Sequence, residues 1–370
     1  MHFLILTCNC GGGHNATAAA ISEHFTAQGH RCTTIDCLQF LPALTAKLIS
    51  EGHIFLYRRA PKLFGIGYRF EERHDPKLMR AQFSRCAKAF TKKVRELEGD
   101  ATISAHVFAS LITTAASKKY GLDIPNYFIA TDYTCSPGVG MLDQDLYFIP
   151  HEELIEEFVQ QGVPREKLVP SGIPVRPSFY KMQPKPEARE QLGLPLTGKV
   201  LLLTCGSMGA GPMKQLAVLL DKTMEPEDHL VVICGTNQKL LKSMEKRDLS
   251  ARVHVLGFTD KIDLYMDAAD VILTKAGGLS TTEALIKRLP LVYVDAIPGC
   301  ETRNLDFMVD RGYAVTAKST QELAALSCML LEDDDRLSDW RDKLHVAFPD
   351  CAIDTIYKEV ENHISNTAAP

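Results

Sequence analysis

The sequence predicts an α/β protein with two Rossmann-like, doubly wound domains, and three observations support that prediction. The chain has 370 residues, enough for two domains at roughly 150 residues each. Short apolar segments alternate with helical segments, which is typical of βαβ units in parallel sheets. Prolines cluster at positions 174, 177, 184, 186 and 195, where they break helices and mark a connection. We therefore place one domain at residues 1–175 and a second at residues 176–347.

The first domain follows the alternating pattern from its first residues. Apolar runs predict these strands: His2–Thr7, Cys32–Cys37, Ala101–Ala105, Asn126–Thr131 and Leu146–Ile149. Segments with apolar residues three and four apart predict the helices Asn15–Gln28, Ser110–Tyr120 and Glu152–Gln161.

The second domain repeats this pattern after the prolines. The expected strands are Lys199–Thr204, Leu230–Cys234, Val253–Leu256, Val271–Thr274 and Leu291–Val294. Between them we expect the helices Pro212–Leu220, Asn237–Lys246, Lys261–Ala268 and Leu279–Arg288. The last sixty or so residues are predicted to be helical, at Leu323–Leu331, Arg336–Val346 and Ile353–Ile364.

Composition excludes several classes of protein. Hydrophobic residues make up 45% and charged residues 24%, which excludes a disordered tail, a collagen-like fibre and a coiled coil. The net charge of 41 − 46 = −5 does not indicate a nucleic-acid partner. Eleven cysteines without a repeated spacing favour a reducing compartment, the cytoplasm by default. No apolar run approaches the roughly 18 residues of a spanning helix.

The segment from Pro42 to Arg95 differs from the rest of the chain in charge. It carries thirteen Lys and Arg residues against four acidic ones, 13 − 4 = +9, with aromatic residues between them. Such a composition is expected where a helix or loop lies on anionic lipid. The candidate membrane-binding residues are Arg58, Arg59, Lys62, Phe64 and Tyr68. The alternative is an ordinary helical insertion with a solvated charged side.

A glycine run follows the first predicted strand. Gly11, Gly12 and Gly13 let the backbone approach a ligand and offer N–H groups at a helix N-terminus. His14 comes next, and an imidazole there suits removal of a proton from an attacking hydroxyl. Alternatively, the glycines only form the turn and His14 caps the helix. A zinc site made of Cys8, Cys10 and His14 lacks a fourth ligand.

Two further glycine-rich turns in the second domain suit a diphosphate, and neither is a P-loop. One holds Gly206, Ser207 and Met208, and the other holds Gly277, Gly278, Ser280 and Thr281. Glu283, one turn into the following helix, can accept hydrogen bonds from ribose hydroxyls, or it can simply complement the helix dipole. Glu301 and Asn304, three residues apart, suit the hydroxyls of a sugar.

Taken together, these motifs resemble the diacylglycerol glycosyltransferases. The matching runs are Asn9-x-Gly-Gly-Gly-His14, Thr131-Asp132, Ser171-Gly-Ile-Pro174, Gly257-Phe258, Gly277–Ala284 and Pro298-Gly-x-Glu-x-x-Asn304. That family includes monogalactosyldiacylglycerol synthase and processive diacylglycerol glucosyltransferase, and is related to the MurG transferase. Two departures, Ala276 and Cys300 where the family usually has Pro and Gln, leave the donor sugar open.

The resemblance implies a GT-B fold, with two doubly wound domains facing across a cleft. It implies a lipid acceptor on the N-terminal domain, a UDP-sugar on the C-terminal domain, and inverting transfer without a metal or cofactor. The last helix, at about residues 348–365, is expected to pack back on the first domain. Within this frame His14 is the candidate base, Gly11–Gly13 and His106 are acceptor-side residues, and Phe258 contacts the uracil ring.

Several alternatives remain open. Asp132 is a second candidate base or orients His14, and His106 and Asp132 can equally serve structural hydrogen bonds. Asp143 and Asp145 suggest a metal-dependent GT-A transferase. A different acceptor, a UDP-sugar epimerase and a non-catalytic UDP-sugar or lipid-binding protein are further alternatives. The partners we expect are a UDP-hexose, diacylglycerol and an anionic membrane surface, with the protein peripherally bound at the inner face of the cell membrane.

Overall fold

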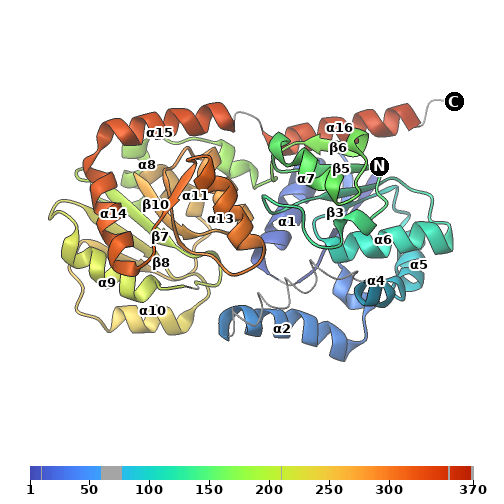
Figure 1. The fold of residues 1–370 in the computed structure, drawn as a ribbon, viewed down its shortest axis with the longest axis horizontal. Coiled ribbons are helices and arrows are strands. Elements are labelled where there is room, and N and C mark those ends of the chain that lie inside the picture. The colour runs from blue at the N-terminus through green and yellow to red at the C-terminus, as the bar shows by residue number, and fades with distance from the viewer. Residues whose placement is uncertain (10, 60–76, 210, 349–350, 368–370) are drawn as a thin grey trace. The chain divides into compact units, whose positions relative to one another are not determined.

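A computed structural model describes residues 1–9, 11–59, 77–209, 211–348 and 351–367 (Figure 1). The chain forms two compact units. Unit 1 comprises Met1–Pro177, Pro298–Cys300 and Asp350–Pro370, and unit 2 comprises Ser178–Ile297 and Glu301–Pro349. The last segment of the chain therefore belongs to the same unit as the first.

Unit 1 is built on a parallel sheet with the strand order β2-β1-β3-β4-β5-β6. The strands are β1 His2–Thr7, β2 Arg31–Asp36, β3 Ala101–Ser104, β4 Asn126–Ile129, β5 Leu146–Ile149 and β6 Leu168–Pro170. The helices are α1 Gly12–Ala27, α2 Ala43–Arg59, α4 Lys77–Ser84, α5 Ala87–Leu97, α6 Val107–Tyr120, α7 Ile155–Gln160 and α16 Ala352–Thr367. All of β1 is buried, which explains why the four residues Phe3–Leu6 between His2 and Thr7 are a continuous apolar run rather than an alternating one.

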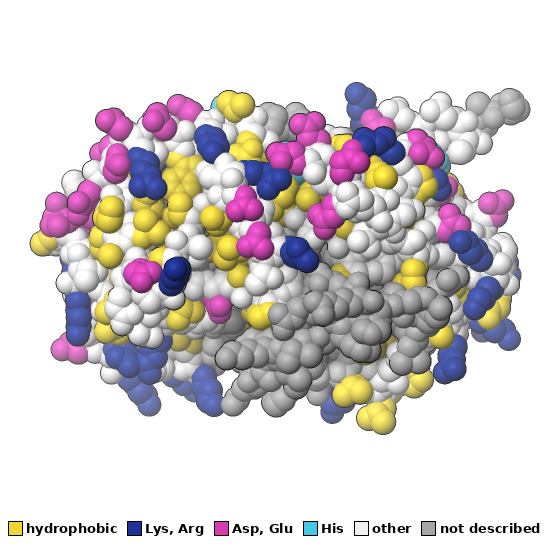
Figure 2. All heavy atoms as spheres, viewed as in Figure 1, with side chains coloured by type: hydrophobic (Ala, Val, Ile, Leu, Met, Phe, Trp, Pro, Cys, Tyr) yellow, Lys and Arg dark blue, Asp and Glu magenta, His cyan; other side chains and the backbone are white. Residues whose placement is uncertain are grey.

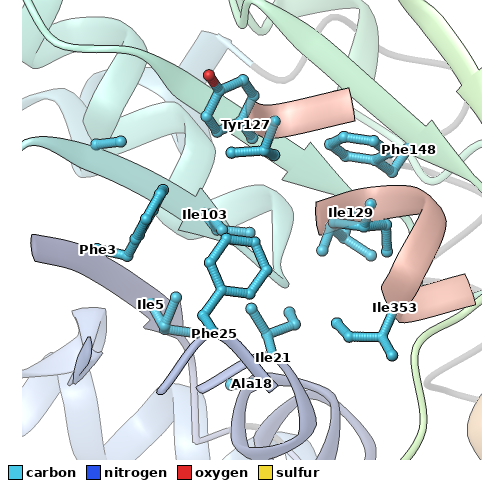
Figure 3. Packing of buried hydrophobic residues seen from close by; sticks show 13 residues of the cluster. Phe3, Ile5, Ala18, Ile21, Phe25, Ile103, Tyr127, Ile129, Phe148 and Ile353 are labelled. Atoms are coloured by element: carbon cyan, nitrogen blue, oxygen red, sulfur yellow. The ribbon is translucent and has the colours of Figure 1, made fainter. Parts of the chain in front are cut away.

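Helix α16 completes the core of unit 1. Its residues Ile353, Ile356 and Val360 are at most 1% exposed and pack with the apolar side chains of β1 and α1. Figure 3 shows Ile353 and Ile21 among the side chains of this single core. Burying three such side chains contributes about 1.5–3 kcal/mol each, which fixes the chain's last helix to its first domain.

Unit 2 repeats the parallel architecture with the order β12-β11-β10-β7-β8-β9. Its strands are β7 Val200–Thr204, β8 His229–Ile233, β9 Val253–Leu256, β10 Val271–Lys275, β11 Leu291–Asp295 and β12 Ala314–Thr316. Its helices are α8 Lys185–Leu192, α9 Met213–Thr223, α10 Gln238–Glu245, α11 Ile262–Ala268, α12 Gly278–Ile286, α13 Cys300–Asp310, α14 Thr320–Glu332 and α15 Asp334–Ala347. Two parallel doubly wound sheets are the predicted fold class.

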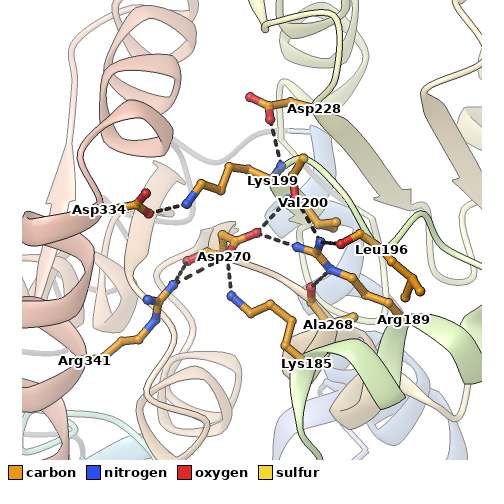
Figure 4. Close-up of polar contacts among 11 residues, drawn as sticks. Lys185, Arg189, Leu196, Lys199, Val200, Asp228, Ala268, Asp270, Asp334 and Arg341 are labelled. Atoms are coloured by element: carbon orange, nitrogen blue, oxygen red, sulfur yellow. Dashed lines mark hydrogen bonds and ion pairs between the residues drawn. The ribbon is translucent and has the colours of Figure 1, made fainter.

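A buried carboxylate anchors α8, the helix of the proline-rich connection, to the sheet of unit 2 (Figure 4). Asp270 precedes β10 and is 4% exposed. Its Oδ2 accepts hydrogen bonds of 2.8 Å from both Arg189 Nη2 and the Val200 backbone N–H. Lys185 of α8 and Arg341 of α15 also pair with this carboxylate. Three cations from two helices thus converge on one strand end.

Acidic side chains gather where α14 ends and α15 begins, as Figure 2 shows. Asp333 caps α15 by accepting a hydrogen bond of 3.0 Å from the Arg336 backbone N–H, and Asp334 and Asp335 follow in its first turn. Negative charge at a helix N-terminus is favourable because the dipole is positive there. The run of four acidic residues 332–335 therefore has a structural explanation.

Candidate functional site

The glycine run after β1 begins a helix one turn earlier than the sequence indicates. Helix α1 starts at Gly12, so His14 lies in its first turn rather than before it. Asn15 fixes this turn, since its Oδ1 accepts from Thr7 Oγ1 at 2.8 Å and its Nδ2 donates to Asn9 Oδ1 at 3.2 Å. The loop follows β1, which pairs with β2 on one side and with β3 on the other. Such switch points are where open parallel sheets bind ligands.

The ring of His14 is oriented by the backbone. Its Nδ1 lies 2.9 Å from the Ala105 carbonyl oxygen and 3.1 Å from Thr131 Oγ1. A carbonyl oxygen only accepts hydrogen bonds, so Nδ1 must carry the proton. In the neutral ring, Nε2 then holds the lone pair. The tautomer is the one that a base acting through Nε2 requires.

His106 lies beside His14 and has the opposite tautomer. Its Nδ1 accepts a hydrogen bond of 3.1 Å from the Phe108 backbone N–H and so caps α6. The proton of the neutral His106 ring is therefore on Nε2. The two ring centroids are 4.4 Å apart in an edge-to-face arrangement. The carboxyl ends of β1 and β3 thus bring together the predicted acceptor-side residues Gly11–Gly13, His14 and His106.

Three further polar residues of unit 1, Asp132, Asp143 and Asp145, are candidates from the sequence. Asp132 follows Thr131, whose hydroxyl oxygen lies 3.1 Å from His14 Nδ1. Asp143 pairs with Lys118 at 2.9 Å, and this hydrogen bond holds the pKa of Asp143 below its usual value. Asp145 Oδ2 accepts from the Asn126 backbone N–H at 2.7 Å. Both carboxylates of the GT-A alternative are thus occupied by contacts within unit 1.

In unit 2 the glycine-rich turns also lie at a switch point. Helix α9 connects β7 to β8 on one side, while β10 pairs with β7 on the other, so the turns after β7 and β10 are neighbours. Gly206 and Gly209 have φ angles of +67° and +51°. A Cβ on Gly209 would lie 2.2 Å from the Cys234 carbonyl oxygen, which excludes every other residue there. The backbone conformation at position 209 therefore requires glycine.

The predicted donor residues divide into accessible and buried ones. Ser207 and Phe258 are exposed, and Phe258 shows 68% of its surface. Met208, Ser280 and Glu283 are half-buried near the starts of the helices that follow the two turns. Gly277 caps α12, and Gly278 is its first residue.

Two predicted donor residues have fully buried side chains with partners inside unit 2. Thr281 is 0% exposed, and its Oγ1 is 2.8 Å from the Tyr293 hydroxyl. Asn304 is 0% exposed, and its Nδ2 donates to the Ala276 carbonyl oxygen at 3.0 Å. The three-residue spacing predicts that Glu301 and Asn304 share one side of α13, but it does not show that this side is buried. Both side chains hold the second glycine turn in place.

Glu301 has a charged partner that the sequence did not indicate. Its carboxylate pairs with the ammonium of Lys275, and its Oε2 accepts from the Ile297 backbone N–H at 3.0 Å. The side chains of Lys275 and Glu301 are only 14% and 11% exposed. A carboxylate predicted to bind sugar is therefore neutralised within the protein.

Three contributors to these sites escaped sequence reasoning. The Ala105 carbonyl carries no signal in its side chain, because any residue provides that oxygen. Thr131 belongs to the Thr131-Asp132 run, which carries a signal, but the candidate residue in that run is the carboxylate of Asp132. Lys275 immediately precedes the second glycine turn, and a cation next to a phosphate-binding loop is a recognisable signal.

The predicted membrane-binding residues fall largely outside what the structure describes. Lys62, Phe64 and Tyr68 lie outside the described residues, and for Arg58 and Arg59 only the helical backbone of α2 is described. The start of α2 does expose Leu44 and Leu48, at 82% and 72%. None of the helices in the described part of the chain is long and apolar enough to cross a bilayer.

Among the same described residues, no group of three or more His, Cys, Asp or Glu side chains is placed to hold a metal ion. Cys8 is buried. The chain's sites are thus described by their hydrogen bonds and ion pairs alone.

Both halves of the chain match known glycosyltransferase families. Residues 14–175 match the monogalactosyldiacylglycerol (MGDG) synthase family, and residues 197–344 match glycosyl transferases group 1. A probable monogalactosyldiacylglycerol synthase 3 of Oryza sativa is 29% identical, over 95% of this chain and 73% of the relative. The processive diacylglycerol beta-glucosyltransferase of Bacillus subtilis is 27% identical, over 90% of this chain and 88% of the relative.

The fold comparison agrees with the sequence comparison. The crystal structure of Acinetobacter baumannii MurG superposes with a TM-score of 0.66 at 16% identity, covering 98% of this chain and 99% of that one. The GT-B fold that the resemblance implied is therefore confirmed.

Proposed function

We propose, from the premise that this chain is a glycosyltransferase homologous to the diacylglycerol glycosyltransferases, that it transfers a hexose from a UDP-sugar to diacylglycerol. We further propose that transfer inverts the anomeric carbon without a metal ion, with His14 as the base. The observation that supports this most directly is the His14 tautomer. Its Nδ1 donates to the Ala105 carbonyl oxygen at 2.9 Å, which leaves the Nε2 lone pair to receive a proton.

In the proposed reaction the acceptor hydroxyl gives its proton to His14 Nε2 as its oxygen attacks the anomeric carbon. The bond from that carbon to the UDP oxygen breaks at the same time, and UDP leaves as an anion. The imidazolium that forms is stabilised because its Nδ1–H already points at a carbonyl oxygen. Glycine-turn N–H groups in unit 2 are suited to stabilise the leaving diphosphate.

Membrane association belongs to the same proposal. Leu44 and Leu48 lie one helical turn apart on α2, and both are exposed. The segment from Pro42 to Arg95 has a charge of +9. Exposed leucines beside an excess of cations favour an anionic lipid surface. We therefore propose peripheral attachment of unit 1 to the membrane that holds the acceptor.

The test is a panel of UDP-sugars incubated with vesicles containing diacylglycerol, with the products identified by mass spectrometry. Hexosyl-diacylglycerol formed in the presence and absence of EDTA is the expected result. Interconversion of the donor without acceptor identifies an epimerase instead. Binding of UDP-sugar without any release of UDP identifies a non-catalytic protein.

The base assignment has its own test. The substitution His14→Ala should lower transfer by a factor of about 10²–10⁴ because general-base catalysis is lost, while UDP binding measured by calorimetry stays unchanged. Thr131→Val is the matched control, since the Ala105 carbonyl still fixes the tautomer, and it should retain most of the activity. Transfer by His14→Ala at the wild-type rate would rule out the assignment.

A further inference from the structure

Lys275 lies between the two glycine turns of unit 2. It is the last residue of β10, and Gly277 N donates back to its carbonyl oxygen at 2.8 Å. A Cβ on Gly206 would lie 3.1 Å from Lys275 Cε, and a Cβ on Gly277 would lie 3.3 Å from Nζ. Both glycines therefore make room for the end of this lysine. Its ammonium lies at the switch point between β7 and β10.

Glu301 holds that ammonium in a largely buried ion pair. The other carboxylate oxygen of Glu301 accepts from the Ile297 backbone N–H at 3.0 Å. A Cβ on Gly277 would also lie 3.6 Å from Glu301 Oε1, so the pair itself borders the glycine turn. Breaking the pair without replacing the lost partner is costly, because it leaves a charge in a poorly solvated place.

A second carboxylate, that of Asp295, lies near this ion pair. Asp295 is the register partner of Lys275 on the neighbouring strand β11. Burial raises the pKa of Asp295, the charge of Glu301 raises it further, and the charge of Lys275 lowers it. A diphosphate entering the glycine turns adds further negative charge, and it competes with Glu301 for the same cation.

We propose that Lys275 is the diphosphate-binding cation of the donor site and that it remains paired with Glu301 until the donor binds. This inference rests on the proposed function, because it takes a nucleoside diphosphate sugar as the ligand. On donor binding the ammonium moves from Glu301 to the diphosphate oxygens. Glu301 Oε1 then accepts a hydrogen bond from a hydroxyl of the sugar, which compensates the carboxylate. UDP without a sugar cannot supply that second contact.

Two substitutions should therefore act in opposite directions on UDP. Lys275→Met should weaken UDP binding by about tenfold or more, since a charge-assisted contact to the diphosphate is lost. Glu301→Gln should tighten UDP binding several-fold, because the ammonium no longer has to leave a carboxylate. It should also remove the advantage of UDP-sugar over UDP. Uridine, which has no phosphate, should bind all variants alike.

Calorimetric titration of the full chain with UDP, UDP-glucose, UDP-galactose and uridine provides the measurement. Lys222→Met, which removes an exposed cation at the other end of α9, is the matched control and should bind as the wild type does. If Lys275→Met fails to fold, Lys275→Met/Glu301→Gln restores charge balance and is compared with Glu301→Gln alone. The double variant should then bind UDP about tenfold more weakly than Glu301→Gln does.

Equal UDP affinity with and without Lys275 would overturn the inference, as would a loss of UDP affinity in Glu301→Gln. Absence of UDP binding by the wild type would overturn it too. If the opposite shifts are seen but no lipid product forms, the donor site stands and the proposed acceptor fails.

Discussion

At the scale of single residues, two neighbouring histidines have opposite tautomers for reasons that the backbone imposes. A carbonyl oxygen determines the proton position on His14, and a helix N–H determines it on His106. Both assignments follow from backbone groups, a carbonyl oxygen for His14 and an N–H for His106. In the neutral rings, Nε2 of His14 is therefore a hydrogen-bond acceptor and Nε2 of His106 is a donor. The two ring centroids are 4.4 Å apart.

The structural and functional roles of His106 can be separated by substitution. His106→Ala should destabilise unit 1 by about 1 kcal/mol, because the N-cap of α6 is lost, whereas His106→Asn should retain the cap. Amide hydrogen exchange in the first turn of α6 measures this difference. If His106 also contacts the acceptor, His106→Asn should keep wild-type protection and lose transfer. Full transfer by His106→Asn would leave capping as the whole role of His106.

The sequence predicts the loops that form the candidate sites more reliably than it predicts which side chains near those loops are accessible to a ligand. His14 could be identified because glycines precede it and an apolar strand precedes them. Helical spacing places Asn304 on one side of its helix with Glu301 but does not give the direction of that side, and the glycine-rich turn does not indicate whether Thr281 is buried. In the structure the side chains of Thr281 and Asn304 are both 0% exposed. The Lys275–Glu301 pair joins residues 26 apart in sequence, and only folding brings them together.

At the scale of elements, α8 depends on the Asp270 carboxylate. Arg189 is 4% exposed, and its guanidinium also donates to the carbonyl oxygens of Ala268 and Gly198, at 3.0 and 2.9 Å. The backbone contacts position the guanidinium, and Asp270 supplies the opposing charge. A buried cation without that charge is strongly unfavourable.

Asp270→Asn should therefore lower the free energy of unfolding of unit 2 by about 3–5 kcal/mol. The single tryptophan, Trp340 of α15, is 6% exposed in unit 2, so its fluorescence during urea unfolding reports on this unit. Asp334→Asn removes a carboxylate whose side chain is 74% exposed and which pairs with Lys199; it should change little. Equal effects of the two substitutions would contradict the buried-charge argument.

The exposed leucines of α2 allow a test of the membrane proposal. The double substitution Leu44→Ser/Leu48→Ser should weaken binding to phosphatidylglycerol-containing vesicles, measured by sedimentation, by about a hundredfold or more, because each inserted leucine contributes about 1.5–3 kcal/mol. Leu196→Ser, at a 63% exposed leucine of unit 2, is the control and should sediment as the wild type does. Neutralising Arg58, Arg59 and Lys62 should weaken binding most on anionic vesicles. Unchanged sedimentation of both altered proteins would favour an ordinary solvated insertion.

Most elements could be predicted because buried parallel strands are continuous apolar runs. Among the strands the exceptions are β6 and β12, each three residues long at one edge of its sheet. Three residues are too few for a period to be recognised. Among the helices, α8 lies within the proline-rich connection, where no helix is predicted; Pro186 stands in its first turn, which tolerates proline. The early start of α1 was also missed, since glycine has a low helix propensity and the contacts of Asn15 that fix this turn are tertiary.

At the scale of the whole molecule, the net charge of −5 conceals the contrast between the Pro42–Arg95 segment and the rest of the chain. The basic part lies in unit 1, while acidic side chains gather over α14 and α15 of unit 2 (Figure 2). Net charge therefore describes solubility but not the partner of either unit. The stability of the folded chain depends instead on where its titratable groups are buried.

Two histidines on neighbouring strands make unit 2 sensitive to acid. His229 of β8 and His254 of β9 have ring centroids 5.6 Å apart. Burial lowers the pKa of both, and the charge of His229 lowers that of His254 further. In the unfolded chain they titrate near 6.5. As the pH falls below about 6.5, the unfolded state binds protons first, so the free energy of unfolding should decrease.

We expect this decrease to be at most about 1.4 kcal/mol per pH unit for each histidine. Urea unfolding followed by Trp340 fluorescence between about pH 7 and pH 5 measures it. The variant His229→Gln/His254→Gln cannot take up these protons, so its stability should depend less on pH across the same range. His345→Gln, at an exposed histidine in the last turn of α15, should keep the wild-type dependence. Because burial lowers the pKa of both rings in the folded state, the unfolded chain takes up these protons at a higher pH. A double variant with an unchanged pH dependence would refute that explanation.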